Sequence, residues 1–388
     1  MSEVSKIVLF GATGSIGEST LKVLRKHAEK MQLVGIACHS SYRELLKIAR
    51  EFEVPNLTIF DERAFEEAAK SPDLPEGITL NCGMNGLLHL ATLPEVTHTL
   101  FAMVGVTGLR PALAAIRQGK TLILANKEIL VMAGELITRE AKKNGATLIP
   151  ADSEHNAIHQ CLNGTEKPEL SRILLTASGG RFLNASLEEM ENVEPEDALQ
   201  HPNWDMGPKI TIDSSTMANK GLEVIEARWL FDVSPRQIKV VIHPQSIVHS
   251  MVEFVDGSIL AQLSPPDMTF AIQNAIFHPR RHQRIMETLD FTGELRLDFQ
   301  PPDEHRFPCL RLARESLEAG GACPTAFNAA NEVAVQAFIE RKIPFLKIPT
   351  TIERTLEKMP SPGLNTLQEI QEADQIARKL AESSLTNA

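Results

Sequence analysis

The sequence predicts an α/β protein with an N-terminal parallel sheet, a central α/β domain and a C-terminal helical domain. First, short apolar runs rich in Val, Ile and Leu alternate with helical stretches up to residue 151, which is typical of a parallel sheet covered on both faces. Second, two strand-like runs that end in Ser-rich loops, "RILLTA" and "KITI", follow this segment. Third, helical periodicity dominates from residue 305 onward.

The length also indicates several domains, because 388 residues are too many for one ordinary hydrophobic core. We expect three domains at residues 1–151, 152–283 and 305–388, with a Pro- and Asp-rich linker at 284–304. The strands of the first domain are expected, in order, at Lys6–Phe10, Leu33–Cys38, Leu57–Phe60, Leu100–Val104, Thr121–Ala125 and Thr147–Ile149.

Composition and charge exclude several classes of protein. Hydrophobic residues make up 43% of the chain, as in a packed protein rather than a disordered one. The formal net charge is −11 and no basic arm or stripe occurs, so nucleic acid is not expected as a partner. The five cysteines are scattered and never in CxxC spacing, which argues against a disulfide framework or a zinc site and indicates a reducing compartment.

Neither a signal peptide nor a membrane span is expected. The N-terminal stretch "MSEVSKIVLF" lacks the apolar core of a signal peptide and enters a strand almost at once. No apolar run approaches the length of a transmembrane helix. We therefore expect a cytoplasmic protein that does not bind a membrane.

A glycine-rich loop, "GATGSIG" at residues 11–17, joins the first strand to the helix "ESTLKVLRKHAEK". Glycines here allow a tight turn and let backbone N–H groups approach a pyrophosphate at the N-terminus of a helix. Between a strand and a helix this pattern predicts a Rossmann-type dinucleotide site. The alternative is a merely tight turn between the two elements.

The second strand ends without the acidic residue that NAD sites usually carry about 20 residues after the glycines. His39, Ser40 and Ser41 stand at this position, and Arg43 follows. Without a carboxylate there is no repulsion against a 2′-phosphate, which hydroxyl groups and a cation can bind. The stretch therefore favours NADP(H), and the alternative is an ordinary polar loop.

Two carboxylates and an imidazole follow the apolar run "ATLI", in the stretch "PADSEHNAIH" at residues 150–159. Asp152 and Glu154 point to the same side if the backbone is extended, which suits a hard divalent cation. The alternative is that Asp152 or Ser153 simply caps the helix that begins here. The local sequence leaves both interpretations open.

The stretch "DSSTMANKGLEVIEARWLF" at residues 213–231 predicts a helix with polar residues at i, i+4 and i+7 on one face, namely Asn219, Glu223 and Glu226. Lys220 lies three residues before Glu223, and an ordinary solvated Lys–Glu pair is the alternative to a site. Ser214 and its neighbouring hydroxyls precede the helix. Hydroxyls, helix N-terminal amides and a lysine together can bind a phosphate.

Three further stretches carry candidate site residues. "TASGG" offers Ser178 and two glycines, which form either a backbone-amide nest for an anion or a plain turn. "HPNWDMGPK" at residues 201–209 has no helical or strand period and is typical of a mobile loop. His243 and His249 are separated by an even number of positions, so they would share one face of a strand, as core residues more often than as ligands.

Together these stretches resemble a known family, 1-deoxy-D-xylulose 5-phosphate reductoisomerase. The resemblance covers nearly the whole chain. It rests on eight motifs in the family's order: "GATGSIG", "LANKE", "DSEHNAI", "ASGG", "HPNWDMG", "DSSTMANKGLEVIEA", "HPQSIVHSMVEF" and "AFNAANEVAVQAF". At residues 39–41 this chain has His-Ser-Ser, where many members have Gly-Lys-Asn-like residues.

The resemblance implies an NADPH-dependent enzyme that also needs a divalent metal, Mg²⁺, Mn²⁺ or Co²⁺. Such an enzyme isomerises 1-deoxy-D-xylulose 5-phosphate to a branched aldehyde phosphate. It then reduces this aldehyde to 2-C-methyl-D-erythritol 4-phosphate, in the non-mevalonate synthesis of isoprenoid precursors. The resemblance also implies a homodimer that acts on a small sugar phosphate.

The same resemblance implies roles for individual residues. The metal ligands are Asp152, Glu154 and Glu223. The catalytic residues are Lys127, Glu154, His201 and Glu223. The residues that contact the substrate are Ser153, Glu154, Ser178, His201, Trp204, Met206, Ser214, Asn219, Lys220, Glu223 and His249. Its phosphate group lies among Ser178, Ser214, Asn219 and Lys220, and a closing flap carries Trp204 and Met206. The residues that bind the cofactor are Thr13, Gly14, Ser15, Ile16, Gly17, His39, Ser40, Ser41, Asn126, Lys127, Glu128 and Gly207.

Two other functions compete with this one. The first is another NADP-dependent Rossmann oxidoreductase that acts on an aldehyde without rearrangement. An acylating enzyme of that kind needs a reactive cysteine beside a base, and Cys161 lies in a predicted helix with no such pairing visible. The second is a non-catalytic, NADP-responsive regulator, which has no need of three carboxylates together with a phosphate site. Metal dependence of turnover discriminates these functions.

Overall fold

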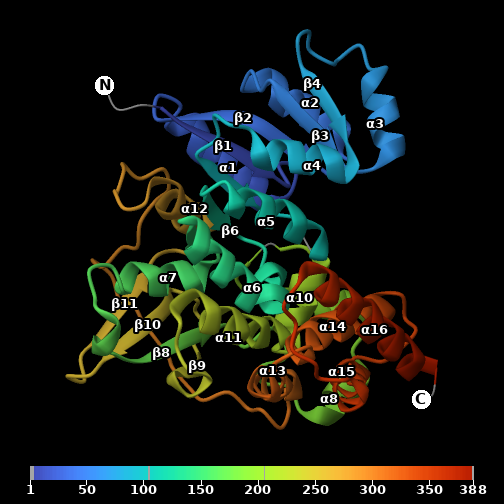
Figure 1. Cartoon of the computed structure of the whole chain (residues 1–388). Helices are drawn as coiled ribbons and strands as arrows, with labels where there is room; N and C mark the ends of the chain where they lie inside the picture. Colours follow the sequence, from blue (N-terminus) through green and yellow to red (C-terminus); the bar gives the residue numbers. More distant parts are fainter. Residues whose placement is uncertain (1–3, 104, 205, 387–388) are drawn as a thin grey trace. The chain divides into compact units, whose positions relative to one another are not determined.

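The computed structural model describes residues 4–103, 105–204 and 206–386. They form two units, each assembled from separate parts of the sequence (Figure 1). The first unit comprises Met1–Ile129, Ile137–Asn156 and Met268–Glu287. The second comprises Leu130–Leu136, Ala157–Asp267 and Thr288–Ala388.

A seven-stranded sheet is the centre of the first unit, and its neighbouring strands are all parallel. Its order is β4-β3-β2-β1-β5-β6-β7, so the direction of strand addition reverses beside β1. Such a reversal is where open α/β sheets bind ligands, at the carboxyl ends of the strands. The strands are β1 (Ser5–Phe10), β2 (Met31–Cys38), β3 (Asn56–Ile59), β4 (Thr79–Cys82), β5 (His98–Phe101), β6 (Thr121–Leu124) and β7 (Thr147–Pro150).

The sheet confirms the predicted parallel, Rossmann-type fold class. Six strands lie at the predicted apolar runs, with small shifts at their ends. Val104, the last residue of one predicted run, lies outside the described residues. The seventh strand, β4, was not predicted, because this edge strand of four residues has no buried side chain and therefore no apolar run.

Helices connect the strands and cover both faces of the sheet. Because crossovers between parallel strands are right-handed, α1, α2 and α3 lie on one face, and α4 and α5 lie on the other. The residues of α4 accordingly contact β1, β2, β3 and β4. These helices are α1 (Ser15–Lys26), α2 (Tyr42–Glu51), α3 (Glu62–Ala69), α4 (Gly83–Thr92) and α5 (Leu109–Arg117).

The loop after β1 needs its glycines for close packing. Gly11 has a φ of +89°, and a side chain there would lie 2.6 Å from the carbonyl oxygen of Ala102, which follows β5. A side chain at Gly17, in the first turn of α1, would lie 2.4 Å from the carbonyl oxygen of Ala12. The loop is therefore held tightly at the position where strand addition reverses.

A late segment of the chain completes the first unit. Helix α12 (Met268–Phe277) packs against α1, and the rings of His27 and Phe277 meet edge to face with centroids 5.0 Å apart. Ile272 and Ile276 join the core of the seven-stranded sheet.

The second unit contains a mixed sheet of four strands in the order β11-β10-β8-β9. Strand β8 is parallel to β9 and antiparallel to β10, which is antiparallel to β11. The first three residues of the edge strand β11 are exposed on both faces of the sheet. The strands are β8 (Leu170–Ala177), β9 (Ile238–Ile242), β10 (Val248–Phe254) and β11 (Ile259–Leu263).

The helices of the second unit confirm the predicted C-terminal helical part. The central one, α14, packs against α10, α11, α13, α15 and α16, and all of its residues from Cys323 to Asn331 are buried. The elements are α8 (Leu187–Glu191), α9 (Pro195–Ala198), α10 (Pro208–Ser215), α11 (Ala218–Phe231), α13 (Pro308–Ala319), α14 (Cys323–Ile339), α15 (Lys347–Lys358) and α16 (Leu367–Thr386).

Two helices belong to both units. Helix α6 (Glu128–Asn144) gives the residues Leu130–Leu136 of its first half to the second unit, and Ala133 among them has non-helical backbone angles. Helix α7 (Ser153–Cys161) begins in the first unit and continues in the second, whose core includes Ile158.

One predicted strand is wrong. The run "KITI", with its two isoleucines and a threonine, suggested a strand, but residues 209–212 belong to α10. Pro208 stands at the first position of this helix, where its fixed φ favours helical backbone and its missing N–H is not needed. Lys209 and Asp213, spaced i and i+4, then form an ion pair at 2.9 Å that only a helix allows.

Within the described part of the chain, no helix is both long enough and apolar enough to span a lipid bilayer.

Candidate functional site

Asp152 lies between the end of β7 and the first turn of α7. Its Oδ1 accepts hydrogen bonds from the backbone N–H groups of Glu154 (3.2 Å) and His155 (3.3 Å). The carboxylate therefore caps the helix, as one of the two sequence interpretations predicted. The cap uses one side of the carboxylate and leaves the rest for other partners.

A lysine and a histidine side chain lie against the same carboxylate. The ammonium group of Lys127 bonds to Oδ2 of Asp152, and Nδ1 of His155 lies 3.1 Å from Oδ1. Burial works to raise the pKa of Asp152, but Lys127 and His155 together hold this pKa well below its usual range. Asp152 is therefore an anion at neutral pH, although only 7% of it is exposed.

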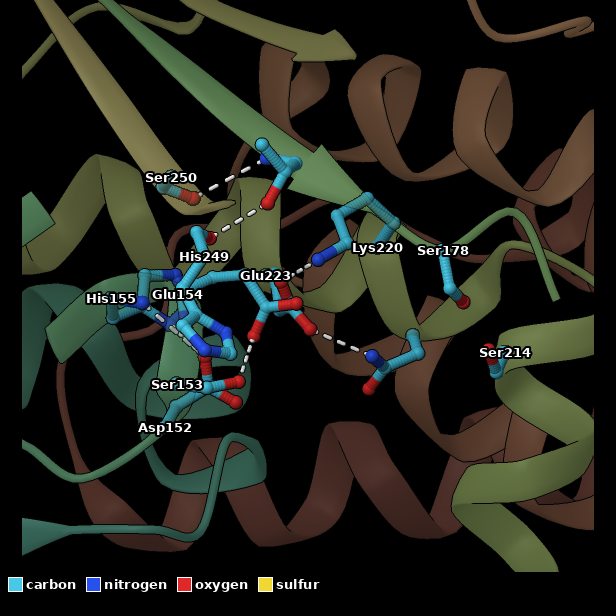
Figure 2. Close-up of polar contacts among 12 residues, drawn as sticks. Asp152, Ser153, Glu154, His155, Ser178, Ser214, Lys220, Glu223, His249 and Ser250 are labelled. Carbon is cyan, nitrogen blue, oxygen red and sulfur yellow. Dashed lines mark hydrogen bonds and ion pairs between the residues drawn. The ribbon is translucent and has the colours of Figure 1, made fainter. Parts of the chain in front are cut away.

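Glu154 stands in the first turn of α7 and is only partly buried. The hydroxyl of Ser153 donates a hydrogen bond of 2.5 Å to Oε2 of Glu154. Figure 2 shows Asp152, Ser153, Glu154 and His155 gathered at this helix start. Two carboxylates thus stand at the carboxyl end of β7, where the fold class places ligands.

The start of α6 brings the "LANKE" residues to the same sheet edge. Lys127 is the N-cap of α6, and the side chain of Asn126 accepts from the N–H of Ile129 at 2.9 Å. The amide of Asn126 also donates to the carbonyl groups of Met103 and Gly105, which follow β5. Asn126 therefore joins two loops, and Glu128, the next residue after Lys127, is buried.

The predicted cofactor residues of the first unit lie at the carboxyl ends of β1 and β2. Gly14 is the N-cap of α1 and provides no side-chain cap to its first amides. These residues range from buried (Gly17) through half-buried (Thr13 and Ile16) to exposed (Gly14, Ser15, His39, Ser40 and Ser41). The carboxylate of Asp61, whose N–H donates to the carbonyl of His39, is engaged as the N-cap of α3 at 2.8 Å from Ala64 N.

In the second unit, helix α11 confirms the predicted polar face. Asn219 donates from Nδ2 to Oε1 of Glu223 at 2.7 Å, and Lys220 donates from Nζ to Oε2 at 2.5 Å. Glu223 is fully buried and Lys220 is 3% exposed. This pair is therefore a buried ion pair on one turn of a helix, and not the solvated pair that the sequence left as the alternative (Figure 2).

A histidine joins the two predicted serines beside this helix. Nε2 of His201 lies 3.1 Å from Oγ of Ser178 and 3.2 Å from Oγ of Ser214. Nδ1 of His201 accepts from the N–H groups of Asn203 and Trp204. Because Nδ1 is an acceptor, Nε2 carries the proton of the neutral ring and donates toward the serine hydroxyls.

Backbone packing fixes the positions of these serines. Gly180 has a φ of +71°, and a side chain there would lie 2.5 Å from the carbonyl oxygen of Ser214. Gly180 N–H in turn donates to the hydroxyl of Ser178 at 3.2 Å. The loop after β8 and the end of α10 are thus in direct contact, which brings Ser178 and Ser214 together.

The segment at residues 201–207 is irregular up to the start of α10, as predicted, and Asp205 lies outside the described residues. Asn203 donates to the carbonyl of Pro244 (2.6 Å) and to Oγ of Ser246 (2.9 Å). The ring of Trp204 faces that of His249, with centroids 6.1 Å apart. Met206 is half-buried and Gly207 is exposed.

The two histidines of "VIHPQSIVHSMVEF" do not share one strand, which corrects the prediction. His249 belongs to β10, where its Nε2 lies 3.2 Å from the carbonyl of Ser264. His243 follows β9, and its Nε2 accepts from the N–H groups of Ile247 and Val248 in the turn before β10. Pro244 and the left-handed Ser246 (φ 52°) break the apolar run into two strands.

Sequence reasoning missed two residues that organise the site. His155 was not selected as a site residue, although its i, i+3 spacing from Asp152 signals the contact. Asn203 was missed because its partners lie more than 40 residues away in the chain, and no local pattern signals such a contact.

Family profiles and known proteins match nearly all of the chain. Three profiles match. The profile named 1-deoxy-D-xylulose 5-phosphate reductoisomerase matches residues 7–134. The profile of the 1-deoxy-D-xylulose 5-phosphate reductoisomerase C-terminal domain matches residues 148–231, and that of the DXP reductoisomerase C-terminal domain matches residues 263–380. Curated proteins named 1-deoxy-D-xylulose 5-phosphate reductoisomerase are similar over almost their whole length. That of Pseudomonas fluorescens Pf-5 is 47% identical, covering 99% of both chains. That of Thermodesulfovibrio yellowstonii is 44% identical, covering 98% of this chain and 100% of the relative.

Solved structures agree with these relatives. A DOX-P reductoisomerase in complex with NADPH, fosmidomycin and magnesium is 40% identical and superposes with a TM-score of 0.94, covering 99% of this chain and 98% of that chain. The enzyme from Zymomonas mobilis in complex with NADPH is also 40% identical and has a TM-score of 0.93. The match covers 100% of this chain and 100% of that chain. With its fold, its motifs and its relatives in agreement over the full length, the chain belongs to the 1-deoxy-D-xylulose 5-phosphate reductoisomerase family.

Proposed function

We propose that this chain performs the reaction of its family, the isomerisation of 1-deoxy-D-xylulose 5-phosphate followed by NADPH-dependent reduction to 2-C-methyl-D-erythritol 4-phosphate. The observation that carries the proposal is the pairing of a carboxylate group suited to a hard cation with a cluster of hydroxyl, imidazole and ammonium groups suited to a phosphate. The substrate carries a hydroxyketone at one end and a phosphate at the other, so it needs both.

We assign the divalent cation to Asp152, Glu154 and Glu223. One oxygen from each carboxylate lies within 4.8 Å of the other two. The all-oxygen donor set suits Mg²⁺ or Mn²⁺ better than a softer metal.

The neighbouring residues prepare these carboxylates for a cation. Lys127 and His155 hold Asp152 ionised, and Lys220 and Asn219 donate to the two oxygens of Glu223. A cation bound there stabilises the negative charge that develops on the substrate oxygens during rearrangement. Lys127, beside Asp152 and at the N-terminus of α6, lies on the side of the nicotinamide site and orients the reacting end of the substrate.

We assign the phosphate to Ser178, Ser214, Asn219 and Lys220. His201 donates from Nε2 toward both serine hydroxyls, so each hydroxyl can turn its own proton toward an anion. The binding energy of this remote phosphate holds the reacting carbon atoms in the orientation that the reaction needs. Trp204 and Met206 then cover the substrate, and their apolar surfaces exclude water while the aldehyde exists.

We assign NADPH to the glycine loop and the end of β2. NADPH supplies the hydride for the second step. Gly14 leaves the first amides of α1 without a side-chain cap, which suits a pyrophosphate. The carboxylate of Asp61, the acid adjacent to the end of β2, is turned to the N-terminus of α3. His39, Ser40 and Ser41 are therefore left to bind the 2′-phosphate.

We further propose a cytoplasmic homodimer. All five cysteines are free of disulfide bonds, which suits a reducing compartment. The edge strand β11 exposes two successive apolar side chains, Ile259 (50%) and Leu260 (51%). Because an exposed apolar edge strand is a template for pairing, a second copy of the chain is the occupant that this surface suits.

An absorbance assay tests the function. Purified protein with NADPH, Mg²⁺ and 1-deoxy-D-xylulose 5-phosphate is expected to oxidise NADPH and to form 2-C-methyl-D-erythritol 4-phosphate, identified by mass and NMR. Chelation of the metal is expected to stop the reaction, and readdition of Mg²⁺ or Mn²⁺ to restore it. Reduction that continues without metal would favour a simple aldehyde reductase, and cofactor binding without turnover would favour a regulator.

A further inference from the structure

A buried carboxylate stands directly before Ser214 and has no place in the assignments above. Asp213 is 1% exposed, lies in the last turn of α10 and receives two hydrogen-bond donors. Lys209, on the same helix, places Nζ 2.9 Å from Oδ2. Asn331, on α14, donates from Nδ2 to Oδ1 at 2.8 Å, across 118 residues of sequence.

The amide of Asn331 is not explained by packing. It lies in the fully buried stretch of α14, among Ala326, Phe327, Ala329 and Ala330. Its Oδ1 is buried and has no hydrogen-bond partner in the described structure. A buried amide with an unpaired oxygen is unfavourable compared with an aliphatic side chain. Its N–H contact with Asp213 is therefore the contact that accounts for an asparagine at this position.

The backbone of Asp213 in turn takes part in the turn that carries Ser214. The hydroxyl of Thr216 donates to the carbonyl of Asp213 at 3.2 Å and accepts from the N–H of Ala218 at 3.3 Å. Between them Met217 adopts a left-handed conformation, with a φ of 63°, that is unusual for a residue with a side chain. A shift of Asp213 would therefore move Ser214 and the N-terminus of α11 together.

The same carboxylate pairs with the first turn of α10, directly after the segment at residues 201–207. Lys209 stands two residues after Gly207, and Thr211 donates from Oγ1 to the carbonyl of Gly207 at 2.9 Å. Asp213 thus joins three parts of the second unit: the first turn of α10 through Lys209, the Ser214 turn through its own backbone, and α14 through Asn331.

We propose that Asn331 is a positioning residue for the phosphate subsite, acting through Asp213 on Ser214 and on the start of α11. The inference rests on the proposed function, since it takes Ser214 and Lys220 as phosphate ligands. It assigns a role in substrate binding to the C-terminal helices, which otherwise contact neither the substrate nor the cofactor in the assignments made above. Asn331 itself does not touch the substrate.

The test compares Asn331→Leu with Asn328→Leu. Asn328 is a matched control because it lies one turn earlier on α14, is equally buried, has an unpaired buried Oδ1 and donates to Glu332 rather than to α10. Asn331→Leu is expected to raise the KM for the sugar phosphate about tenfold, as expected for one lost hydrogen bond to a charged group. The KM for NADPH is expected to stay unchanged. Asn328→Leu is expected to leave both constants unchanged, whatever its effect on the melting temperature.

A second variant adds a pH signature that a merely structural role would not produce. Asn331→Asp places a second carboxyl group against Asp213, and two adjacent carboxylates raise the pKa of one of them. The KM defect of this variant is expected to be small at low pH, where one group is protonated, and to grow as the pH rises. Asn331→Leu is expected to show the same defect at every pH.

Binding measurements separate this inference from the proposed function. Calorimetry with a compound that carries a hydroxamate at one end and a phosphonate at the other, in the presence of Mg²⁺, needs no turnover. If the wild type binds this compound but does not turn over the sugar phosphate, the proposed function fails and Asn331→Leu is judged by binding alone. The role of Asn331 would be overturned if Asn331→Leu and Asn328→Leu weakened binding of the sugar phosphate or of this compound equally. It would also be overturned if the KM defect of Asn331→Asp did not change with pH. If the wild type binds neither compound, both proposals are wrong.

Discussion

Gly180 shows how one side chain decides the geometry of the proposed phosphate subsite. With a φ of +71° and the backbone of Ser214 and Ser215 within 2.8 Å of an added side chain, this position accepts only glycine without a shift of the turn. We expect Gly180→Ala to raise the KM for the sugar phosphate and to lower the free energy of unfolding by roughly 2 kcal/mol. Steady-state kinetics and urea unfolding measure the two effects.

Gly363→Ala is the control, because an added side chain there meets no atom within 4 Å. It is expected to change neither quantity. An unchanged KM in Gly180→Ala would mean that the loop after β8 moves independently of Ser214.

Asp152 makes a charge-dependent contribution to stability. We expect Asp152→Asn to keep the helix cap but to leave the buried ammonium group of Lys127 without a counter-charge, which destabilises the protein by roughly 3 kcal/mol at pH 7. The pKa of Asp152 is lower in the folded than in the unfolded state, so its contribution is present above about pH 4 and is lost as the pH falls through the folded-state pKa. The difference in the free energy of unfolding between the variant and the wild type should therefore become smaller below pH 4.

Urea unfolding at pH 7 and at decreasing pH measures this difference. Asp73→Asn, which removes an exposed partner of Arg50 in the same unit, is expected to change stability by less than about 1 kcal/mol at any pH. A difference for Asp152→Asn that is constant with pH would contradict the ion pairs described above. Turnover is expected to be lost in Asp152→Asn in either case.

At the scale of single elements, the segment at residues 201–207 is expected to move when the substrate site is filled. It has no regular structure in its described residues, and it is attached by His201 and Asn203 at one end and by α10 at the other. In a Trp229→Phe background, fluorescence then reports on Trp204 alone. We expect the emission to change on binding of the hydroxamate–phosphonate compound, and not on binding of NADPH alone. An unchanged spectrum, together with unchanged protease sensitivity of the segment, would argue against a lid.

Local patterns predicted most elements because most elements are locally determined. The parallel strands were predicted from buried apolar runs and the C-terminal helices from their periodicity. Three exceptions are α10, where a proline start outweighed β-branched residues, the apolar run of residues 241–254, which a turn divides between β9 and β10, and β4, which has no buried face to leave a pattern. The predicted domain boundaries at residues 151, 283 and 304 stay a prediction.

In the candidate site, too, contacts within one element were predicted and contacts between distant segments were not. Spacing within one helix predicted the contacts of Asn219 and Lys220 with Glu223, and both are confirmed at hydrogen-bond distance. Contacts between distant segments leave no local signal, so the contacts of Asp213 with Asn331 and of Asn203 with Pro244 were not predicted. The assignment of individual residues to metal, phosphate and cofactor came from resemblance to a family, because spacing alone does not distinguish a ligand from a helix cap.

At the scale of the whole molecule, the apolar edge of β11 is expected to hold two copies together. Ile259→Lys combined with Leu260→Lys places two charges on this edge, where they would be buried against the same charges of a second copy. We expect size-exclusion chromatography with light scattering to report a dimer for the wild type and a monomer for this variant. Ile376→Lys, which changes an equally exposed residue of α16, is the control and should stay dimeric. A wild-type monomer, or a dimeric double variant, would contradict pairing through β11.

The return of the chain to the first unit has a consequence for protein synthesis. Helix α1 leaves the ribosome early, but α12, which packs against it, is made only after the second unit's sheet has been translated. Until then the nascent chain exposes the surface of α1 that later contacts Phe277. The glycine loop therefore lies in a domain that is completed after much of its neighbour. A product terminated before residue 268 lacks a finished nucleotide domain, although it contains every strand of that sheet. The first unit is therefore complete only after translation has passed residue 287.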